Sequence, residues 1–422
     1  MEPAVRDALR VALSSGVDEA LSAALHPAEA GRLERFAGRL PTVGEGIVEI
    51  PLGPARAGAG PDFHLMPHAV DDRLRLAGVL RRMPEAAGAD RDDAMAMADL
   101  IESWPTDAGL VCEYDVDTDA AVRLPSLFLN FPAAWTEVEH GAARDLLFGR
   151  LPDWQPCRAG IEALAAAAGA GSRVSWIGVM LPRRPRVLRV NLAFVPDERI
   201  GAILEGRLPP DRVGRACDAL GWAAAAAERA VLAVDLSADG LGADVGLECF
   251  VDDRSGEDVD CWSGFLDAAR RRGLISEAES VALCSWPGRT MPASRAVPPW
   301  PDAWIVADLF GDGRLPQCLR EVNHLKVTAK ASGRTTLKAY LRFLLDWTAV
   351  ETGERPVQPQ PPGGADFLAA VRHGDTVREA VRRAFSDPYP PRLADVAQCA
   401  GFTFDGSDYR SDWMVRRLGS SA

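Results

Sequence analysis

The sequence predicts an α+β fold: a ten-stranded antiparallel β-barrel with a solvent-filled lumen, ringed by α-helices. Pairs of short strands recur five times, near residues 47, 110, 174, 231 and 322, and a long helical stretch separates each pair from the next. Single strands between helices, as in a Rossmann layout, do not match this pattern. Five hairpins supply ten strands, which suits a barrel wide enough to hold a ligand.

The clearest hairpin joins residues 323–330 to residues 336–343 through a turn at 332–334. Side chains of a strand point alternately to its two faces, so this hairpin has one apolar face and one polar, cationic face. If helices cover the apolar faces of all five hairpins, the polar faces must surround a lumen. The polar series here is His324, Lys326, Thr328, Lys330, Lys338, Tyr340 and Arg342.

The composition is that of an ordinary globular protein, with 422 residues, 47% hydrophobic and 25% charged. A net charge of −13 argues against nucleic acid or an anionic membrane as the main partner. The start Met1–Asp7 is no signal peptide, and no apolar run reaches the roughly 18 residues of a membrane span. The eight cysteines are scattered singly and have no zinc-ligand spacing. We therefore expect a cytoplasmic protein with reduced thiols.

The elements between the hairpins follow from apolar periodicity. Helices are expected at 3–38, 70–104, 140–170, 197–229, 259–285 (with a break at Gly273-Leu274) and 365–400. Hairpins are expected at 46–50/62–66, 110–116/126–131, 174–181/187–194, 231–236/245–251 and 323–330/336–343. A Pro-rich loop at 287–302, an extended stretch at 304–310 and a linker at 355–364 complete the chain. We expect one domain over 1–422, with repeats near 1–70, 71–135, 136–196, 197–255 and 256–345 and a helical tail at 365–422.

This arrangement resembles the ABBA prenyltransferases, in which an ααββ unit repeats five times around a ten-stranded barrel, and it is nearest the dimethylallyl-tryptophan synthase-like branch. The topological likeness covers nearly the whole chain. Lys338-Ala339-Tyr340 fits the family's Lys-x-Tyr pairs, and Lys326 fits the basic partner on the preceding strand. Arg189-Val190-Asn191 departs from the pattern, since Asn replaces Tyr. In the family, tyrosines that line the barrel shield the allyl cation, but this chain has four tyrosines, of which only Tyr340 clearly points inward. Either Trp176 and Phe250 supply the aromatic shielding instead, or the activity has diverged from that of the family.

The resemblance, combined with strand alternation, implies a set of site residues. An acid that takes a proton from the acceptor is implied at Glu113 or Asp115, and Glu248 is a further general base. The diphosphate group is implied to bind Arg189, His324, Lys326, Lys338, Tyr340 and Arg342. The acceptor and prenyl pocket is implied at Trp176, Met180, Asn191 and Phe250. There is no DDxxD motif, no protein metal site is expected and no cofactor is required, although Mg²⁺ can accompany the diphosphate through Asp115.

The expected function is transfer of an isoprenyl group from its diphosphate to an electron-rich aromatic or peptide side-chain acceptor in secondary metabolism. The expected partners are these two substrates, without nucleic acid or membrane, in a monomer or homodimer. Two alternatives stay open: a barrel with non-prenyl chemistry on a natural product or peptide, and a non-catalytic barrel that binds an anionic ligand.

Each site residue also has a structural alternative. His324, Lys326, Lys338 and Arg342 could form the solvated face of an ordinary sheet. Glu113 and Asp115 could lie at an exposed strand edge or in salt bridges, and Glu248 could form a structural ion pair. Trp176 and Phe250 could belong to the core. His64 and His68 form a loose pair for which metal binding is not expected.

Overall fold

The computed structural model describes most of the chain between residues 23 and 349. The described residues are 9, 11–13, 23–40, 45–56, 60–82, 91–116, 123–169, 171–181, 186–193, 195, 197–251, 261–290 and 314–349, and then 367, 370–371, 375–384, 396–397, 399–400 and 402. The expected extended stretch 304–310, the linker 355–364 and residues 291–302 of the Pro-rich loop lie outside them. The division into one domain and five repeats stays a prediction.

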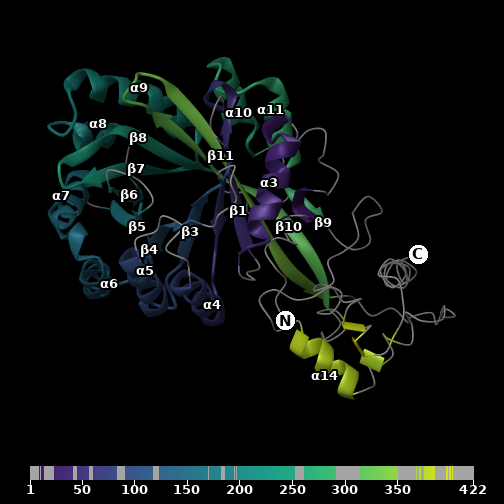
Figure 1. Ribbon diagram of the computed structural model, residues 1–422. Helices are drawn as coiled ribbons and strands as arrows, with labels where there is room; N and C mark the ends of the chain where they lie inside the picture. The colour runs from purple at the N-terminus through teal and green to yellow at the C-terminus, as the bar shows by residue number, and fades with distance from the viewer. Residues whose placement is uncertain are drawn as a thin grey trace.

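Ten antiparallel strands close into a barrel (Figure 1). In sheet order they are β1 (Glu45–Leu52), β2 (Asp62–Leu65), β3 (Leu110–Asp115), β4 (Ser126–Asn130), β5 (Arg173–Val179), β6 (Leu188–Ala193), β7 (Arg229–Ser237), β8 (Gly240–Phe250), β10 (Arg314–Ala329) and β11 (Thr335–Ala349). The barrel closes because β11 pairs with both β10 and β1. The predicted fold class is confirmed.

Helices surround the barrel (Figure 1). They are α3 (Pro27–Ala37), α4 (Val70–Arg81), α5 (Arg91–Ser103), α6 (Glu137–Arg150), α7 (Arg158–Ala168), α8 (Asp197–Leu204), α9 (Pro210–Ala226), α10 (Ser263–Arg271) and α11 (Glu277–Ser285); α14 (Asp375–Ala384) follows in the C-terminal part. Two short 3-10 helices, η1 (Gly53–Arg56) and η3 (Pro152–Cys157), join these elements. Among the described residues, no helix combines the length and the hydrophobicity that crossing a membrane requires.

Two expected elements need correction. The helix expected over 3–38 is interrupted before α3, because His26 has an extended backbone and caps the new helix through a capping box with Glu29. Pro27 then occupies the first helical turn, where its missing N–H costs nothing. Part of the expected loop 287–302 is a strand, β9 (Gly288–Thr290), which pairs with Cys318–Arg320 of β10.

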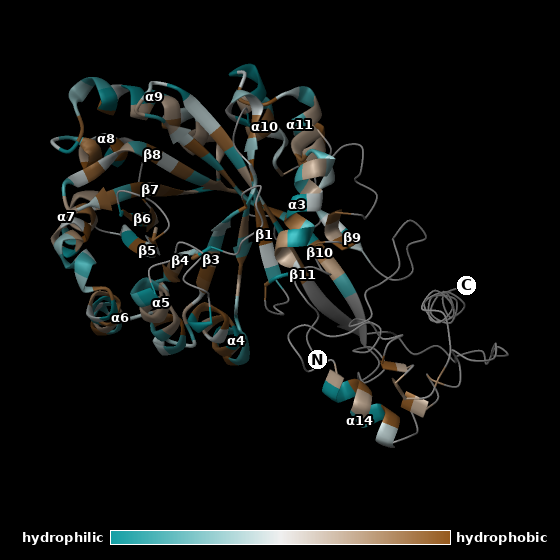
Figure 2. Ribbon diagram, viewed as in Figure 1, coloured by the Kyte–Doolittle hydropathy of each residue, from teal (hydrophilic) through white to brown (hydrophobic). Residues whose placement is uncertain are grey.

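Strand alternation separates the two sides of the barrel wall. Residues such as Leu325, Val327 and Leu337 are almost fully buried in the core between strands and helices. Figure 2 shows hydrophobic segments alternating with hydrophilic ones along the strands. The intervening residues face the lumen. The break expected at Gly273 is confirmed: this residue follows α10 with a φ of 67°, a backbone conformation that glycine adopts without strain.

Candidate functional site

A cavity of about 360 Å³ lies in the barrel lumen. Its wall combines aromatic rings with charged and amide groups, the mixture expected of a site that both holds and orients a ligand. Each of the ten barrel strands contributes at least one residue. The lining residues are Ile47, His64, Met66, Val111, Glu113, Phe128, Asn130, Arg173, Ser175, Trp176, Arg189, Asn191, Ala193, Arg229, Val231, Glu248, Phe250, Asn323, His324, Lys326 and Tyr340.

The charges around this cavity have the opposite sign to the whole chain. Four cationic side chains line it against two carboxylates, whereas the chain carries a net charge of −13. The cations are Arg173, Arg189, Arg229 and Lys326, and the carboxylates are Glu113 and Glu248. A positive lumen inside an acidic protein favours an anionic ligand.

Glu248 of β8 is held by two partners across the lumen. Lys326 Nζ donates to its Oε1 at 2.9 Å, and Asn191 Nδ2 donates to its Oε2 at 2.9 Å. Burial raises the pKa of Glu248, but the charge and hydrogen bond of Lys326, together with the charges of His324 and Arg189, outweigh it, and the net pKa is lowered. Glu248 is therefore an ionised carboxylate in a buried ion pair with Lys326. A structural ion pair is the alternative that the sequence analysis gives for this residue.

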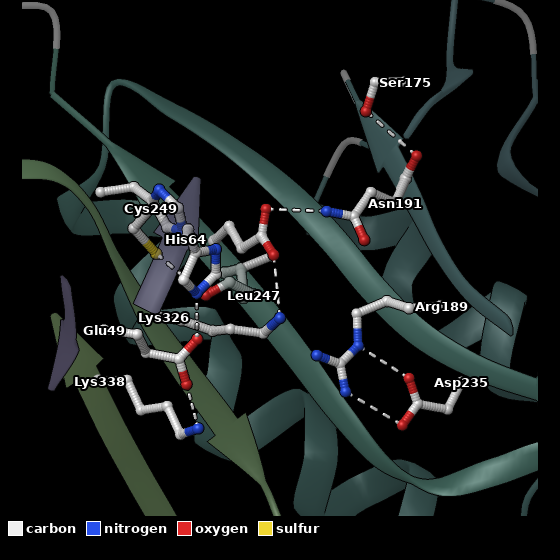
Figure 3. Close-up of polar contacts among 12 residues, drawn as sticks. Glu49, His64, Ser175, Arg189, Asn191, Asp235, Leu247, Cys249, Lys326 and Lys338 are labelled. Carbon is white, nitrogen blue, oxygen red and sulfur yellow. Dashed lines mark hydrogen bonds and ion pairs between the residues drawn. The ribbon is translucent and has the colours of Figure 1, made fainter. Parts of the chain in front are cut away.

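Glu49 of β1 is a second buried carboxylate, 2% exposed, that the sequence reasoning missed. Its Oε1 accepts from Lys338 of β11, and its Oε2 lies 3.2 Å from His64 Nε2 of β2 (Figure 3). Burial raises the pKa of Glu49, yet Lys338 and His64 bring it well below the usual value. Burial and the charge of Glu49 together raise the pKa of Tyr340. Lys338 is therefore paired with the Glu49 carboxylate and is not available to bind a ligand.

Arg189 of β6 forms a bidentate pair with Asp235 of β7, with Nε and Nη2 at 2.8 and 3.2 Å from the two carboxylate oxygens (Figure 3). Beyond this pair lies a second, smaller cavity of about 130 Å³. Arg189, Lys326 and Tyr340 border both cavities, so they form the partition between them. Lys338 and Thr328 line the second cavity and not the first.

Arg342 does not line either of these cavities. Its Nε donates to Glu45 Oε1 at 2.5 Å and its Nη1 to Glu321 Oε1 at 2.6 Å. His68 Nε2 also contacts Glu45, at 2.7 Å. Arg342 therefore belongs to a four-residue network with Glu45, Glu321 and His68, and it does not reach the first cavity as predicted.

Three carboxylates gather beside Glu49. Oxygen atoms of Asp62, Glu113 and Asp115 lie within 4.8 Å of one another, and Glu49, His64 and Glu113 form a second such group. Burial, followed by the charge of Glu49, raises the pKa of Asp62 to about 9. This pKa favours a protonated Asp62 at pH 7, and its Oδ2 lies 3.8 Å from Nζ of Lys338, the cation that Glu49 also contacts. Asp115 is exposed and does not line the first cavity.

His324 is packed between two aromatic rings. It stacks on Tyr340 at a centroid distance of 3.9 Å and lies 5.0 Å from Phe250. Burial lowers the pKa of His324 to about 4, against the opposing charge of Glu248. The imidazole is neutral at pH 7, so His324 is not the cation that the sequence reasoning placed in the diphosphate set.

Arg173 and Arg229 contribute cations that sequence reasoning missed. Arg229 is exposed at the start of β7, and its guanidinium lies 4.0 Å from the centroid of the Phe250 ring. Among the described residues, it has no carboxylate partner. Arg173 Nη1 donates to the carbonyl oxygen of Phe131 at 2.9 Å. Burial and then the charge of Arg229 lower the pKa of Arg173, so the two guanidinium groups act on one another and concentrate positive charge.

The predicted acceptor pocket is brought together except for Met180. Trp176, Asn191 and Phe250 all line the first cavity. Met180 is a fully buried hydrophobic residue that lines neither of the two cavities. A β-bulge between Val174 and Trp176 turns Ser175 inward as well, which simple alternation could not predict.

Similarity to known proteins is found among solved structures. No protein-family model matches the chain, and no curated protein matches it. Among solved structures, prenyltransferase PriB in its apo form is similar over 80% of this chain and 96% of its own, with 14% identity and a TM-score of 0.48. AnaPT from Neosartorya fischeri is similar over 80% and 94%, with 11% identity and a TM-score of 0.45. The strand pairing shows a closed ten-stranded antiparallel barrel ringed by helices, and prenyltransferase PriB and AnaPT are solved structures to which the chain is similar.

Proposed function

We propose that this protein is an aromatic prenyltransferase-like enzyme that transfers an isoprenyl group from its diphosphate to an electron-rich aromatic or peptide side-chain acceptor in secondary metabolism. The observation that carries the proposal is the cavity of about 360 Å³ in which cations outnumber carboxylates and aromatic rings form the walls. An isoprenyl diphosphate has one strongly anionic end and one apolar end, and this cavity offers a surface for each.

The anionic end would bind near Arg229, for which the described residues supply no carboxylate partner. Lys326 and Arg189 each hold a carboxylate, whereas Arg229 is held by the Phe250 ring and lies near Arg173. Arginine suits phosphate oxygens because its planar fork donates two parallel hydrogen bonds. We place the diphosphate against Arg173 and Arg229, with Arg189 and Lys326 adding charge from the partition.

Bond breaking needs stabilisation of the leaving group. The C–O bond of the allylic diphosphate breaks with its electron pair moving to the diphosphate oxygen, and preplaced guanidinium groups stabilise the charge that develops there. Phe128, Trp176 and Phe250 would flank the isoprenyl cation. A carbon or heteroatom of the acceptor then forms the new bond.

The acceptor must finally lose a proton. Glu113 and Glu248 line the cavity and could accept it, whereas the exposed Asp115 does not reach this cavity. Glu248 is a weak base in the free protein because Lys326 lowers its pKa. Glu113 is therefore the preferred general base, and Glu248 positions groups around it.

In this proposal Lys338, Tyr340 and Arg342 have structural roles and do not bind the diphosphate directly. Their contacts with Glu49, His324 and Glu45 fix the wall that carries the binding groups. Oxygen donors at Asp62, Glu113 and Asp115 fit the ligand preference of Mg²⁺, so the metal could join the diphosphate there. Activity with and without a chelator measures whether it does.

The deciding experiment is a mass-spectrometric screen of dimethylallyl and geranyl diphosphate against indoles, phenols and aromatic peptides, with released diphosphate measured in parallel. The proposal expects a product heavier by one isoprenyl unit, one diphosphate released per product, and loss of turnover in Glu113→Gln. The matched control is Glu162→Gln on the outer helix α7, which keeps activity. The opposite outcome is that the protein binds the isoprenyl diphosphate but forms no product, and that Glu113→Gln binds it as tightly as the wild type. That outcome would identify a non-catalytic barrel that binds an anionic ligand.

A further inference from the structure

Three buried side chains in the barrel wall bring one imidazole and two carboxylates together. They are Glu49, His64 and Glu113, which are 2%, 6% and 3% exposed. Each offers one ligand atom, and these atoms lie within 4.8 Å of one another. An imidazole nitrogen combined with carboxylate oxygens is a donor set that divalent transition metal ions accept.

The strand register builds this group. In the pairing of β2 with β3, His64 lies directly opposite Glu113. In the pairing of β1 with β2, Ile47 lies opposite His64, and Glu49 follows two residues later on the same face of β1. Ile47, His64 and Glu113 all line the first cavity, so this is the lumen face of the three strands. The candidate ligands therefore come from three adjacent strands of a closed barrel, which hold them more precisely than loops would.

The separation of two of these ligand atoms matches the separation around a single ion. Two donors about 2.1 Å from one ion lie roughly 3.0 Å apart in octahedral coordination and roughly 3.4 Å apart in tetrahedral coordination. His64 Nε2 and Glu49 Oε2 lie 3.2 Å apart, between these two values (Figure 3). An ion that binds both atoms takes the place of the hydrogen bond between them and requires no movement of the strands.

The groups around these ligands also suit a metal site. Lys338 donates to Glu49 Oε1, which orients the carboxylate and leaves Oε2 for an ion. The Tyr340 ring lies edge-on to the His64 imidazole, with the ring centroids 5.5 Å apart. Partners of this kind hold metal ligands in their binding orientation. The first cavity reaches His64 and Glu113, so it gives an ion access to them and holds space for water at its open positions.

Two neighbouring groups differ from this one in their donors. Asp62, Glu113 and Asp115 offer oxygen atoms alone, which suit Mg²⁺. His68 lies 2.7 Å from Glu45, but among the described residues no third ligand atom joins that pair. His64 therefore distinguishes a transition-metal site from an all-oxygen site.

We propose that Glu49, His64 and Glu113 bind one divalent transition metal ion of the series from Mn²⁺ to Zn²⁺, a site that the sequence analysis does not expect. The proposal does not rest on isoprenyl transfer, because no substrate takes part in it. The ion and that reaction compete for one group, since Glu113 is the general base of the proposed function. Bound metal should therefore inhibit the transfer.

Titration of the full-length protein with Co²⁺ at pH 7, followed by visible absorption, tests the site in the absence of substrate. We expect one Co²⁺ per chain and no charge-transfer band of the kind that a thiolate ligand gives. Mg²⁺ should bind at least about tenfold more weakly, because it prefers oxygen donors. Absence of Co²⁺ binding, a thiolate band, or equal affinity for Mg²⁺ would each overturn the proposal.

Three variants locate the ion. Glu113→Gln keeps the shape of one ligand and removes its charge, and His64→Phe keeps a ring beside Tyr340 and removes the nitrogen. Each should weaken Co²⁺ binding by at least about tenfold, since loss of a group that only supports a ligand already costs about 10- to 100-fold. His68→Phe is the matched control and should bind Co²⁺ as the wild type does. Unchanged affinity in Glu113→Gln or His64→Phe, or an equal loss in His68→Phe, would refute the assignment.

The outcome is separate from that of the turnover screen. Binding of Co²⁺ to these three residues without any prenylated product supports the metal site and rejects the proposed transfer. Prenylated product from a protein that binds no Co²⁺ supports the transfer and rejects the metal site.

Discussion

At the scale of single residues, burial decides which lumen groups carry charge. His324 was expected to be a cation from the pattern of its strand, yet its buried ring between Tyr340 and Phe250 is neutral. Asp62 was not singled out, and burial, followed by the charge of Glu49, raises its pKa to about 9, so that it too is neutral at pH 7. Desolvation and neighbouring charges are both set by the fold and not by the local sequence.

The titration of His324 gives a prediction about acid stability. Its pKa is 6.5 in the unfolded chain and about 4 in the folded protein, so the unfolded state binds the proton first as the pH falls. The stability that the neutral ring contributes is present above pH 6.5 and is lost as the pH falls towards 4. At 1.36 kcal/mol per pKa unit, the loss amounts to about 3 kcal/mol.

Denaturant unfolding at pH 7 and pH 4.5 measures this effect as the difference between wild type and His324→Phe. The variant should lose less stability between the two pH values than the wild type does. Nitrogen-15 NMR should also show a proton on Nδ1 and none on Nε2 at pH 7, because Nδ1 lies 2.8 Å from Asn323 Oδ1, which accepts. An equal pH dependence in both proteins, or a proton on Nε2, would contradict the account of this residue.

At the scale of elements, the strands position the site through register and through small irregularities. Gly178 of β5 is paired with Phe128 of β4, and a Cβ at Gly178 would lie 2.5 Å from the Phe128 ring. The missing side chain leaves room for that ring against the strand. Phe128 can therefore line the cavity without filling it.

Gly178→Ala should push the Phe128 ring into the lumen. Because the atoms in the way belong to the end of a side chain, we expect a modest fall in melting temperature and a loss of affinity for an aromatic ligand of about tenfold. Gly149→Ala in α6 is the control, since a Cβ there meets nothing within 4 Å. Ligand titration and thermal unfolding of both variants check this, and unchanged affinity in Gly178→Ala would show that the ring has other space.

Strand boundaries explain which site residues sequence reasoning found. Asn191, Glu248 and Lys326 lie in the middle of well-patterned strands, so alternation placed them correctly in the lumen. Arg229 lies two residues before the strand expected from Val231, and Arg173 lies one residue before the strand expected from Val174. Hydrophobic periodicity is least informative at such ends.

At the scale of the whole molecule, the closed barrel follows from the five repeated hairpins, whereas the pairing of charges within it does not. Lys338 contacts Glu49 from 289 positions away in the sequence, and Lys326 contacts Glu248 from 78 positions away. Such pairs become neighbours when β11 closes onto β1 and β10 pairs with β8. A pattern read along the chain contains the residues of the site but not their partners.

The distribution of charge is the central feature of the molecule. Of the four cations that line the cavity, Arg189 and Lys326 pair with Asp235 and Glu248, while Arg229 lies over the Phe250 ring. The rest of the protein is acidic. The structure thus combines an overall charge that disfavours general anion binding with one lumen that favours it.

The most direct measurement is the thermal stabilisation of the protein by geranyl diphosphate in the wild type, Arg229→Met and Arg272→Met. Arg272 is a matched control, since its guanidinium also lies over an aromatic ring, that of Trp222 at 4.6 Å, but outside the lumen. A ligand at about 100 times its Kd adds about 2.7 kcal/mol of stability, so we predict a clear rise in Tm for the wild type and for Arg272→Met. Arg229→Met should lose most of that rise at the same ligand concentration. No rise in the wild type, or an equal rise in Arg229→Met, would contradict the account.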